Sequence, residues 1–432
     1  MNIIPKTKEK IEGKIKYNFE GGNLSSDSGL IIFKKFIDEF GLKNLVQENM
    51  NFSDRNFICF FQRLYLRMAG YNNDLVLKDL KLDPIFQKML NISDLYSQST
   101  MSRFDNDLDE VDLQSFDKLN FSLLEKSYKK DLPERVILDI DSTGIRTFGN
   151  QNKQAYNGHY KENGYHPLMV FDGITGDLIK AELRPGNVYT SNGVVEFITP
   201  VIEWYKKNFP EIELHFRGDS GFAIPELYEL LEKHNIEYGI RLKSNNILKQ
   251  LTKSPENYFS KKELSDGSVH LVKFDNFDYK AGSWKKERSV KVKIEKKAGT
   301  LIPRITYIVT NKKDNTKEIL NYYTDRGKME NFIKEIKNGF GLKNLSHKEF
   351  IVNQNKLAQL MIIYNINNLM RRLVFPKEFA KYRIETIRYK FIKIASKSVK
   401  SGRVHTFKMS SSYPYKKEFL EIISNIEKIS VA

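Results

Sequence analysis

Acidic side chains stand at three places where the surrounding pattern does not need them for solubility. The first is Leu138-Asp-Ile-Asp-Ser-Thr143, the second is Asp219 in the segment Phe216-Arg-Gly-Asp-Ser-Gly-Phe222, and the third is Glu330. Alternate residues of a strand point to the same face, so Asp139 and Asp141 share one face of the first segment. An acid at a strand tip beside glycines, where another molecule can approach closely, fits either a turn or chemistry.

The segment around Glu330 is predicted to be a helix with an unusual edge. At about 100° per residue, Tyr323, Arg326, Glu330 and Lys337 fall within about 60° of arc. The neighbouring arc is apolar and comprises Met329, Phe332, Ile333 and Ile336. The apolar stripe should pack into the core, and its edge should present a lone acid between cations. That arrangement fits a metal ligand next to phosphate-binding groups.

Each acid also has an ordinary structural interpretation. Asp141, directly before Ser-Thr, could be a turn or cap residue, and Asp219 could form an Asx turn or start a helix. Glu330 could be an ordinary surface residue on its helix. Taken together, two acids at strand ends followed by one on a helix favour a common site.

The elements that position these acids follow from the hydrophobic pattern. Residues 1–130 show mostly helical spacing, whereas the pattern changes to strands after residue 134. The predicted order from there is strand, strand, strand, helix, strand, helix, strand. These elements are expected at 135–141, 166–172, 177–184, 194–208, 211–219, 225–234 and 236–242. This order predicts a mixed sheet with helices on its faces.

The remaining residues divide into three parts. Residues 245–318 are rich in lysine and contain strand-like runs at 268–274, 289–295 and 304–310, which predicts a β-rich insertion. A long helix is expected to begin near Asn321, with further helices to about Leu373. A basic stretch at 377–400 follows, and a short amphipathic helix is predicted at 415–429.

The charge is unevenly placed along the 432 residues. The formal net charge is +16, yet residues 1–130 are balanced with 19 basic and 19 acidic residues. Residues 321–432 carry 22 basic and 9 acidic residues. Such an asymmetric basic region favours a polyanion partner, above all nucleic acid.

Composition excludes several other classes of protein. The single cysteine, Cys59, allows no internal disulfide and no cysteine-based zinc site, which fits a reducing interior. The N-terminal residues contain no apolar core of a secretory signal. No run reaches about 18 apolar residues, so no membrane span is expected.

At this point the sequence resembles a known family, the DDE transposases of bacterial insertion sequences, specifically the insertion sequence 1380 family, a relative of the insertion sequence 4 type. The family signature Tyr-x2-Arg-x3-Glu-x6-Lys fits Tyr323, Arg326, Glu330 and Lys337 at all four positions. Leu-Asp-Ile-Asp-Ser-Thr matches the strand of the first acid, and Arg-Gly-Asp-Ser-Gly-Phe matches the second. Three outer segments also look like family segments: 24–30, 97–104 and 410–415.

The resemblance implies an α/β fold with an RNase H-like catalytic core, interrupted by the β-rich insertion and preceded by a helical region. It divides the chain as follows: 1–130 helical, with possible DNA-end binding; 131–244 first part of the core; 245–318 insertion; 319–376 helical completion of the core; 377–432 basic C-terminal region.

The resemblance also implies the catalytic residues. Asp141, Asp219 and Glu330 are expected to be the catalytic triad and to hold two Mg²⁺ or Mn²⁺ ions. Asp141 is preferred to Asp139 because the match is to the acid directly before Ser-Thr, and Asp139 is expected to be structural or supporting. Arg326 and Lys337 are expected to clamp DNA phosphates, and Tyr323 to pack on sugar or phosphate.

The implied function is DNA cleavage at the ends of an insertion sequence, followed by joining of the 3′-hydroxyls to target DNA. Double-stranded DNA, comprising terminal inverted repeats and target, is the expected partner. A homodimer on DNA and a location in the bacterial cytoplasm, at the nucleoid, are also expected. Two alternatives stay open: a catalytically silent or repurposed DNA-binding protein, and an RNase H-like nuclease that cuts without joining.

Tryptophan and histidine are two further residue types that could have a functional role. A related type of transposase uses a tryptophan of its insertion to hold a flipped base, and Trp284 lies in this insertion. Core packing is nevertheless the favoured interpretation of Trp284. The seven histidines show no pair at close metal-ligand spacing and are expected to be structural.

Overall fold

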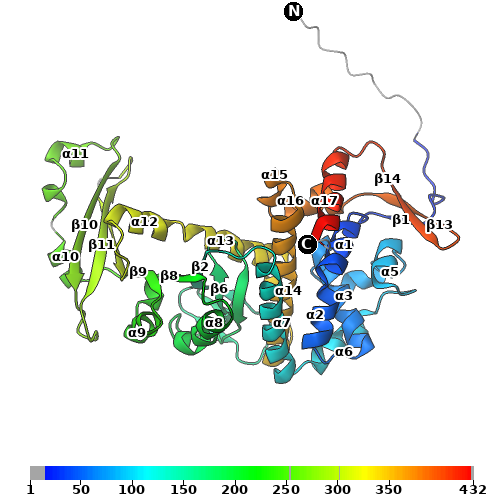
Figure 1. Ribbon diagram of the computed structural model, residues 1–432, viewed down its shortest axis with the longest axis horizontal. Helices are drawn as coiled ribbons and strands as arrows, with labels where there is room; N and C mark the ends of the chain where they lie inside the picture. The colour runs from blue at the N-terminus through cyan, green and yellow to red at the C-terminus, as the bar shows by residue number, and fades with distance from the viewer. Residues whose placement is uncertain (1–14, 253, 301, 430–432) are drawn as a thin grey trace, which may run out of the picture.

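A mixed eight-stranded sheet extends from the middle of the protein to one of its ends (Figure 1). The structure is a computed structural model that describes residues 15–252, 254–300 and 302–429. The strand order is β10-β11-β12-β9-β8-β2-β6-β7. The strands are β2 (Arg135–Ser142), β6 (Leu168–Asp172), β7 (Leu178–Glu182), β8 (Glu213–Gly218), β9 (Glu237–Leu242), β10 (Leu271–Tyr279), β11 (Arg288–Lys296) and β12 (Arg304–Thr310).

Five of these strands form an RNase H-like core. β2, β6 and β7 pair in antiparallel fashion, whereas β8 and β9 run parallel to β2 and to each other. Helices α8 (Val194–Asn208) and α9 (Pro225–Lys233) connect the parallel strands. The α/β fold class expected from the sequence is confirmed, and each core element lies within a few residues of its predicted place.

The two faces of the sheet are covered by different helices. Val136, Leu138 and Ile140 of β2 belong to the hydrophobic core that includes α8 and α9. Because side chains alternate along a strand, Asp139 and Asp141 point to the opposite face, as the sequence predicted. On that side Met169 and Phe171 of the neighbouring β6 belong to the core that includes the N-terminal helices.

The β-rich insertion continues the central sheet. β12 pairs with β9 in antiparallel register, with Tyr307 opposite Leu242, and β11 and β10 follow outward. Alternate residues of β11, namely Val290, Val292 and Ile294, are buried in the same core as Ile240 of β9. Two short helices, α10 (Asn246–Leu251) and α11 (Lys261–Ser265), complete this part of the chain. The domain boundaries inferred from the sequence stay a prediction.

The N-terminal helices pack around one long helix of the C-terminal half. These helices are α1 (Leu30–Phe40), α2 (Leu42–Asn49), α3 (Asp54–Ala69), α4 (Leu77–Leu80), α5 (Pro84–Leu90), α6 (Gln98–Asp107) and α7 (Glu110–Tyr128). They share a single hydrophobic core with α14 (Phe350–Val374). None of the described helices combines the length and the apolar character needed to cross a bilayer.

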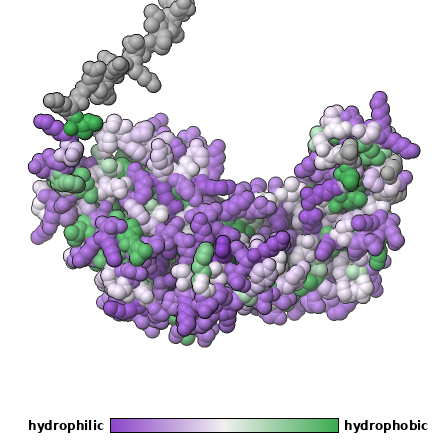
Figure 2. Space-filling model, turned by 180° about the vertical axis from the view of Figure 1, so that it is seen from behind, coloured by the Kyte–Doolittle hydropathy of each residue, from purple (hydrophilic) through white to green (hydrophobic). Residues whose placement is uncertain are grey.

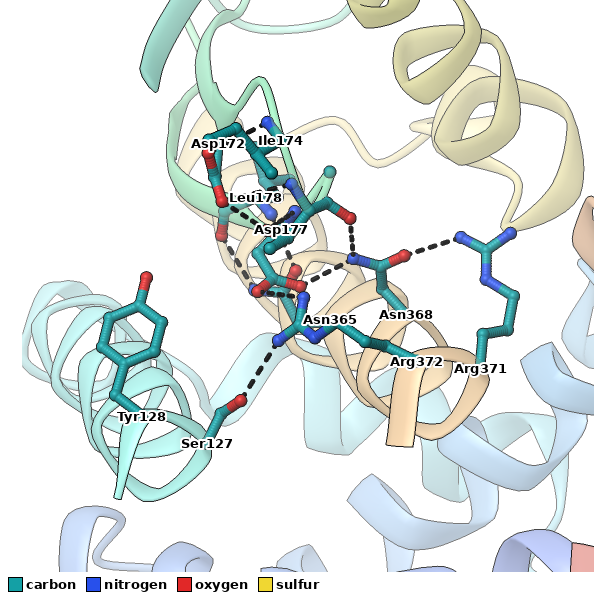
Figure 3. A network of polar contacts seen from close by, with 12 residues as sticks. Ser127, Tyr128, Asp172, Ile174, Asp177, Leu178, Asn365, Asn368, Arg371 and Arg372 are labelled. Atoms are coloured by element: carbon teal, nitrogen blue, oxygen red, sulfur yellow. Dashed lines mark hydrogen bonds and ion pairs between the residues drawn. The ribbon is translucent and has the colours of Figure 1, made fainter. Parts of the chain in front are cut away.

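Helix α14 is fixed to the sheet by a buried polar network (Figure 3). Asp177, which is fully buried in the β6–β7 turn, accepts hydrogen bonds from Asn368 and Arg372. Asn365 accepts from the backbone N–H of Leu178, donates to its carbonyl oxygen, and so holds the start of β7. Buried polar groups that satisfy one another in this way fix one relative placement of the two elements.

A helical segment crosses from the insertion to the N-terminal helices along one edge of the molecule (Figure 1). It comprises α12 (Thr316–Thr324), α13 (Gly327–Lys334) and a π-helical turn (Glu335–Gly339). Viewed from behind, the molecular surface is hollowed between its two raised ends (Figure 2). The segment runs between these ends.

Two small sheets were not foreseen from the sequence. One comprises β3 (Ile145–Arg146), β4 (Ala155–Asn157) and β5 (Glu162–Tyr165), between β2 and β6. The other joins β1 (Leu24–Ser25) to a hairpin of β13 (Ser396–Ser401) and β14 (Val404–Met409). The basic C-terminal region also contains the helices α15 (Lys377–Ala380), α16 (Ile384–Ile387) and α17 (Lys416–Ile429).

Candidate active site

Asp141 lies at the C-terminal end of β2 and is held by two groups. Its Oδ1 accepts the backbone N–H of Ser142 at 2.9 Å, and its Oδ2 lies 3.0 Å from the Arg326 guanidinium. The side chain is 20% exposed. Burial raises the pKa of the Asp141 carboxyl above its usual value, whereas Arg326 lowers it and the nearby Asp219 raises it. Asp141 therefore accepts a local backbone hydrogen bond and also forms an ion pair with Arg326.

Asp219 lies directly after β8, the strand parallel to β2. Its Oδ1 accepts the N–H of Gly221 at 2.8 Å and caps a short 3₁₀ turn, Ser220–Phe222. The Asx-turn interpretation is thus correct, but it occupies only one of the two carboxylate oxygens. Because the C-terminal ends of adjacent parallel strands meet at one edge of a sheet, Asp141 and Asp219 line the same cavity of about 480 Å³.

The far wall of this cavity comes from segments that the sequence analysis did not single out. It consists of Tyr156, Asn157, Gly158, His159, Tyr160, His166 and residues 186–190. Tyr156 and Tyr189 expose 59% and 62% of their surface. The sequence signal available for this wall was the cluster Tyr-Asn-Gly-His-Tyr at 156–160. This cluster lies between β2, which carries Asp141, and β6, the strand that pairs with β2.

Asp139 has a different environment from Asp141, two residues away. It is fully buried and receives two hydrogen bonds of 2.6 Å from the Arg217 guanidinium of β8. Arg217 also donates to the carbonyl oxygen of Tyr322 in α12, at 2.6 Å. This pair ties two central strands to the helix that precedes Glu330. The geometry agrees with the structural role that the sequence analysis gave Asp139.

The helix expected to carry four site residues is interrupted between Tyr323 and Glu330. α12 ends at Thr324 and α13 begins at Gly327, so Arg326 lies in the junction. This position lets its guanidinium donate to the carbonyl oxygen of Ile140 at 2.9 Å and contact Asp141. Arg326 is thereby held against the end of β2.

Glu330 lies one turn beyond Arg326, but its carboxylate is turned to solvent. Its side chain is 68% exposed and lies 3.7 Å from the ammonium of Lys334. Glu330 does not belong to the lining of the cavity that holds Asp141 and Asp219. The structure therefore brings together two of the three expected acids and leaves the third on the outer side of the same helical segment.

Lys337 and Tyr323, the two other expected site residues, make contacts of different kinds. The Lys337 ammonium donates to Thr143 Oγ1 at 3.2 Å and to the carbonyl oxygen of Gly144 at 2.8 Å, so it supports the loop that follows β2. Tyr323 is half-buried beside Ile308 and Ile319. Burial raises the pKa of Tyr323, so its hydroxyl stays a hydrogen-bond donor at neutral pH.

The donor set of the cavity suits a hard cation in part. Asp141 and Asp219 offer carboxylate oxygens beside a polar cavity, and oxygen is the donor that Mg²⁺ and Mn²⁺ prefer. Two neighbouring like charges also favour a bound cation. Within the described part of the chain, however, no three acidic, histidine or cysteine side chains converge closely enough to hold a metal ion.

Trp284 and the histidines have mostly structural surroundings. Trp284 is 6% exposed and packs edge-on against Tyr228 and Tyr279, which agrees with the core-packing interpretation. His166 is buried, with Nδ1 2.9 Å from the carbonyl oxygen of Val188. His159 and His166 both line the cavity, so a structural role does not describe them fully.

Comparisons with known proteins give one family and several distant structural likenesses. The family model described as "Transposase DDE domain group 1" matches residues 7–431. No curated protein matches the chain. A piggyBac transposase synaptic complex with hairpin DNA is 15% identical with a TM-score of 0.42, covering 84% of this chain and 79% of that chain. A Mos1 mariner paired-end complex with Mn is 16% identical with a TM-score of 0.18, covering 38% and 58%.

Proposed function

Because the chain belongs to the family of transposases with a DDE domain, group 1, we propose that it cleaves the ends of its own insertion sequence and joins the freed 3′-hydroxyls to target DNA. The motif spacing of Tyr323, Arg326, Glu330 and Lys337 supports a finer placement in the insertion sequence 1380 family. The protein would then act on the DNA of a bacterial nucleoid, and joining two ends calls for at least two protomers on the DNA.

One observation carries the proposal furthest. The carboxylates of Asp141 and Asp219 end adjacent parallel strands, line one cavity and have the Arg326 guanidinium beside them. A pair of acids beside a guanidinium group, at one open edge of a sheet, suits a substrate that brings both phosphate groups and metal ions.

Asp141 and Asp219 are the residues proposed to hold divalent cations, and Glu330 is proposed as the third ligand. Two such ions, when bound, would activate an attacking oxygen and stabilise the leaving oxygen of a phosphodiester. The free oxygen of Asp219 and the Arg-paired oxygen of Asp141 are the available donors at the cavity. Glu330, being exposed, is free to change its side-chain rotamer toward them.

The same site can serve both chemical steps because the nucleophile is an oxygen each time. In the first step water attacks the phosphorus at the element end, and the bond to the 3′-oxygen breaks. In the second step that 3′-hydroxyl attacks a target phosphodiester and a new phosphodiester forms while a target 3′-oxygen leaves. Orientation of the two reacting oxygens in line with phosphorus is the main task of the protein.

Three residues are proposed to contact the DNA backbone. Arg326 offers a planar guanidinium suited to two-point contact with phosphate once a cation neutralises Asp141. Lys337 uses two of its three N–H donors on Thr143 and Gly144, which leaves one for a phosphate. Tyr323 offers a ring for sugar contact and a hydroxyl donor.

Cleavage of a labelled duplex that carries the element's own end tests this function. We expect nicking by the wild-type protein with Mg²⁺ or Mn²⁺, none with EDTA, and a loss of at least about a thousandfold in Asp219→Asn. Strand joining should accompany nicking when target DNA is present. Cutting that survives in Asp219→Asn contradicts the site, nicking without joining favours the nuclease alternative, and binding without cutting favours the silent DNA-binding alternative.

The role of Glu330 has a matched control on the same helical segment. Asp325 is 63% exposed and contacts Lys328, much as Glu330 is 68% exposed and contacts Lys334. We expect Glu330→Gln to abolish metal-dependent nicking and Asp325→Asn to leave it within about twofold, because only Glu330 is proposed to bind a cation. Equal activities of the two variants would remove Glu330 from the site.

A further inference from the structure

The segment between Glu385 and Glu418 contains no acidic residue. Its 32 positions, 386–417, carry nine lysine and arginine residues. In the fold this segment forms a π-helical turn (Arg388–Ile392) and then the β13–β14 hairpin. The hairpin lies at the end of the molecule opposite to the insertion (Figure 1). The hairpin and the strands β10 and β11 therefore lie at opposite ends of the molecule (Figure 1).

The cations near the base of the hairpin already have partners inside the protein. Arg388 donates to the carbonyl oxygens of Met68 and Arg67, and Lys390 donates to the hydroxyl of Tyr415. Lys393 forms an ion pair with the buried Asp27 at 2.6 Å. These three residues stabilise the fold.

The cations on the hairpin itself are different. Lys397, Lys400, Arg403 and Lys408 are all exposed. None of the four makes a side-chain ion pair or hydrogen bond with any residue that the structure describes. The hairpin thus presents four positive charges without a protein counter-charge.

The strand register concentrates two of these charges on one face. Lys397 of β13 lies directly opposite Lys408 of β14, so both side chains point to the same side. Like charges in directly opposed positions destabilise a strand pair. An anion placed between the two ammonium groups would relieve that repulsion.

The opposite face of the hairpin anchors it to the protein. Phe407 and Met409 pack against the main hydrophobic core, and Ser396 bonds to the buried Ser28. β1 adds a third strand along β13. At the tip, an added Cβ on Gly402 would meet nothing within 4 Å, so the turn projects into open space. The hairpin is an anchored ribbon with a free basic face.

We propose that the free face of the β13–β14 hairpin binds the sugar–phosphate backbone of duplex DNA at a site separate from the carboxylate cavity. The inference rests on the proposed function and adds a second contact surface to it. Two strands about 4.8 Å apart form a ribbon narrow enough for the DNA major groove, which is about 12 Å wide. The deep, narrow major groove of duplex RNA would not admit it.

The salt dependence of DNA binding tests the proposal. The probe is a duplex of about 30 base pairs, roughly three helical turns. Lys400 lies opposite His405 on the anchored face and is left unchanged. Combined Lys397→Gln, Arg403→Gln and Lys408→Gln substitutions should weaken binding tenfold or more. They should also flatten the slope of log K against log salt by about 0.9 for each lost phosphate contact. The matched control removes three exposed lysines from α7 to α9: Lys118→Gln, Lys206→Gln and Lys233→Gln.

A single substitution separates binding from folding. Lys408→Glu should place an opposite charge across from Lys397 and raise the thermal unfolding midpoint slightly, while it lowers DNA affinity. A loss of affinity together with a loss of stability would instead assign the lysines a structural role. The Gln variants keep the long side chains and should unfold at the wild-type temperature.

The outcomes distinguish this proposal from the proposed function. If the wild type cuts DNA with metal and the hairpin variant keeps the wild-type salt slope, the hairpin proposal fails and the function stands. If the slope of log K against log salt flattens as much in the control variant as in the hairpin variant, the effect comes from the overall charge of the protein. The hairpin proposal then fails as well. If the wild type neither binds nor cuts duplex DNA, the function itself fails. Equal binding of duplex RNA would overturn the assignment to DNA.

Discussion

Two aspartates separated by one residue have different surroundings in this protein. Asp139 is fully buried and its charge is neutralised by Arg217, whereas Asp141 reaches the cavity. We expect Asp139→Asn to lower the free energy of unfolding by about 3–5 kcal/mol, because it leaves a buried guanidinium without its counter-charge. Asp141→Asn should change that free energy by less than about 1 kcal/mol and abolish nicking. Denaturant titration and the cleavage assay on both variants check this, and the reverse pattern would exchange the two roles.

Single residues also show how far the sequence could be interpreted. Strand alternation correctly predicted that Asp139 and Asp141 share a face. It could not reveal that Arg217, 78 positions later, neutralises one of them, because that contact depends on the parallel pairing of β2 with β8. The side-chain direction of Glu330 was equally inaccessible. The sequence predicted one uninterrupted helix, with Glu330 on the same edge as Arg326. The spacing of the apolar residues did not reveal the junction before Gly327.

At the scale of the elements, a close approach between segment 24–30 and residues 391–394 explains why small residues stand at 28 and 29. Ser28 and Gly29 donate their backbone N–H groups to Ile394 and Ile392, next to the root of the basic hairpin. A Cβ on Gly29 would overlap the carbonyl oxygen of Phe391. We expect Gly29→Ala to destabilise the protein by about 3 kcal/mol or more, because a backbone atom cannot move aside as a side chain can.

Gly282 provides the control for that substitution. A Cβ there would meet nothing within 4 Å, so Gly282→Ala should shift the thermal unfolding midpoint by no more than about a degree or two. If Gly29→Ala were as well tolerated as Gly282→Ala, the close contact between α1 and the C-terminal segment would not exist in solution.

The elements that could be predicted are those with long, regular hydrophobic patterns. β2, α8, β8 and α9 all lie within three residues of their expected ends. The strands β3, β4 and β5 have only two to four residues each, which is too short for a periodic signal. The hairpin strands contain Ser, Lys and Thr with few apolar residues, so their pattern indicated only a basic stretch.

Taken as one molecule, the protein joins its insertion to the central sheet through continuous strand pairing. β12 and β9 pair directly, and Val290, Val292 and Ile294 of β11 with Tyr307 and Val309 of β12 belong to the core that includes α8 and α9. The sequence predicted a β-rich insertion but not this continuity, since strand partners across a sheet leave no local signature. Removing the insertion would expose β9 as an unpaired edge strand.

The chain carries its own pair of reporters for this continuity, because it has two tryptophans. Trp204 of α8 stacks on Phe121, with ring centroids 4.7 Å apart, and reports the core. Trp284 packs against Tyr228 and Tyr279 and reports the insertion. We expect Trp204→Phe and Trp284→Phe each to unfold in guanidinium chloride with a fluorescence midpoint that coincides with the circular-dichroism midpoint of the same variant, because one shared core unfolds cooperatively. Comparison within each variant removes any change in stability that the substitution itself causes. An earlier fluorescence transition in Trp204→Phe alone would mean that the insertion opens before the catalytic core and is a separate folding unit.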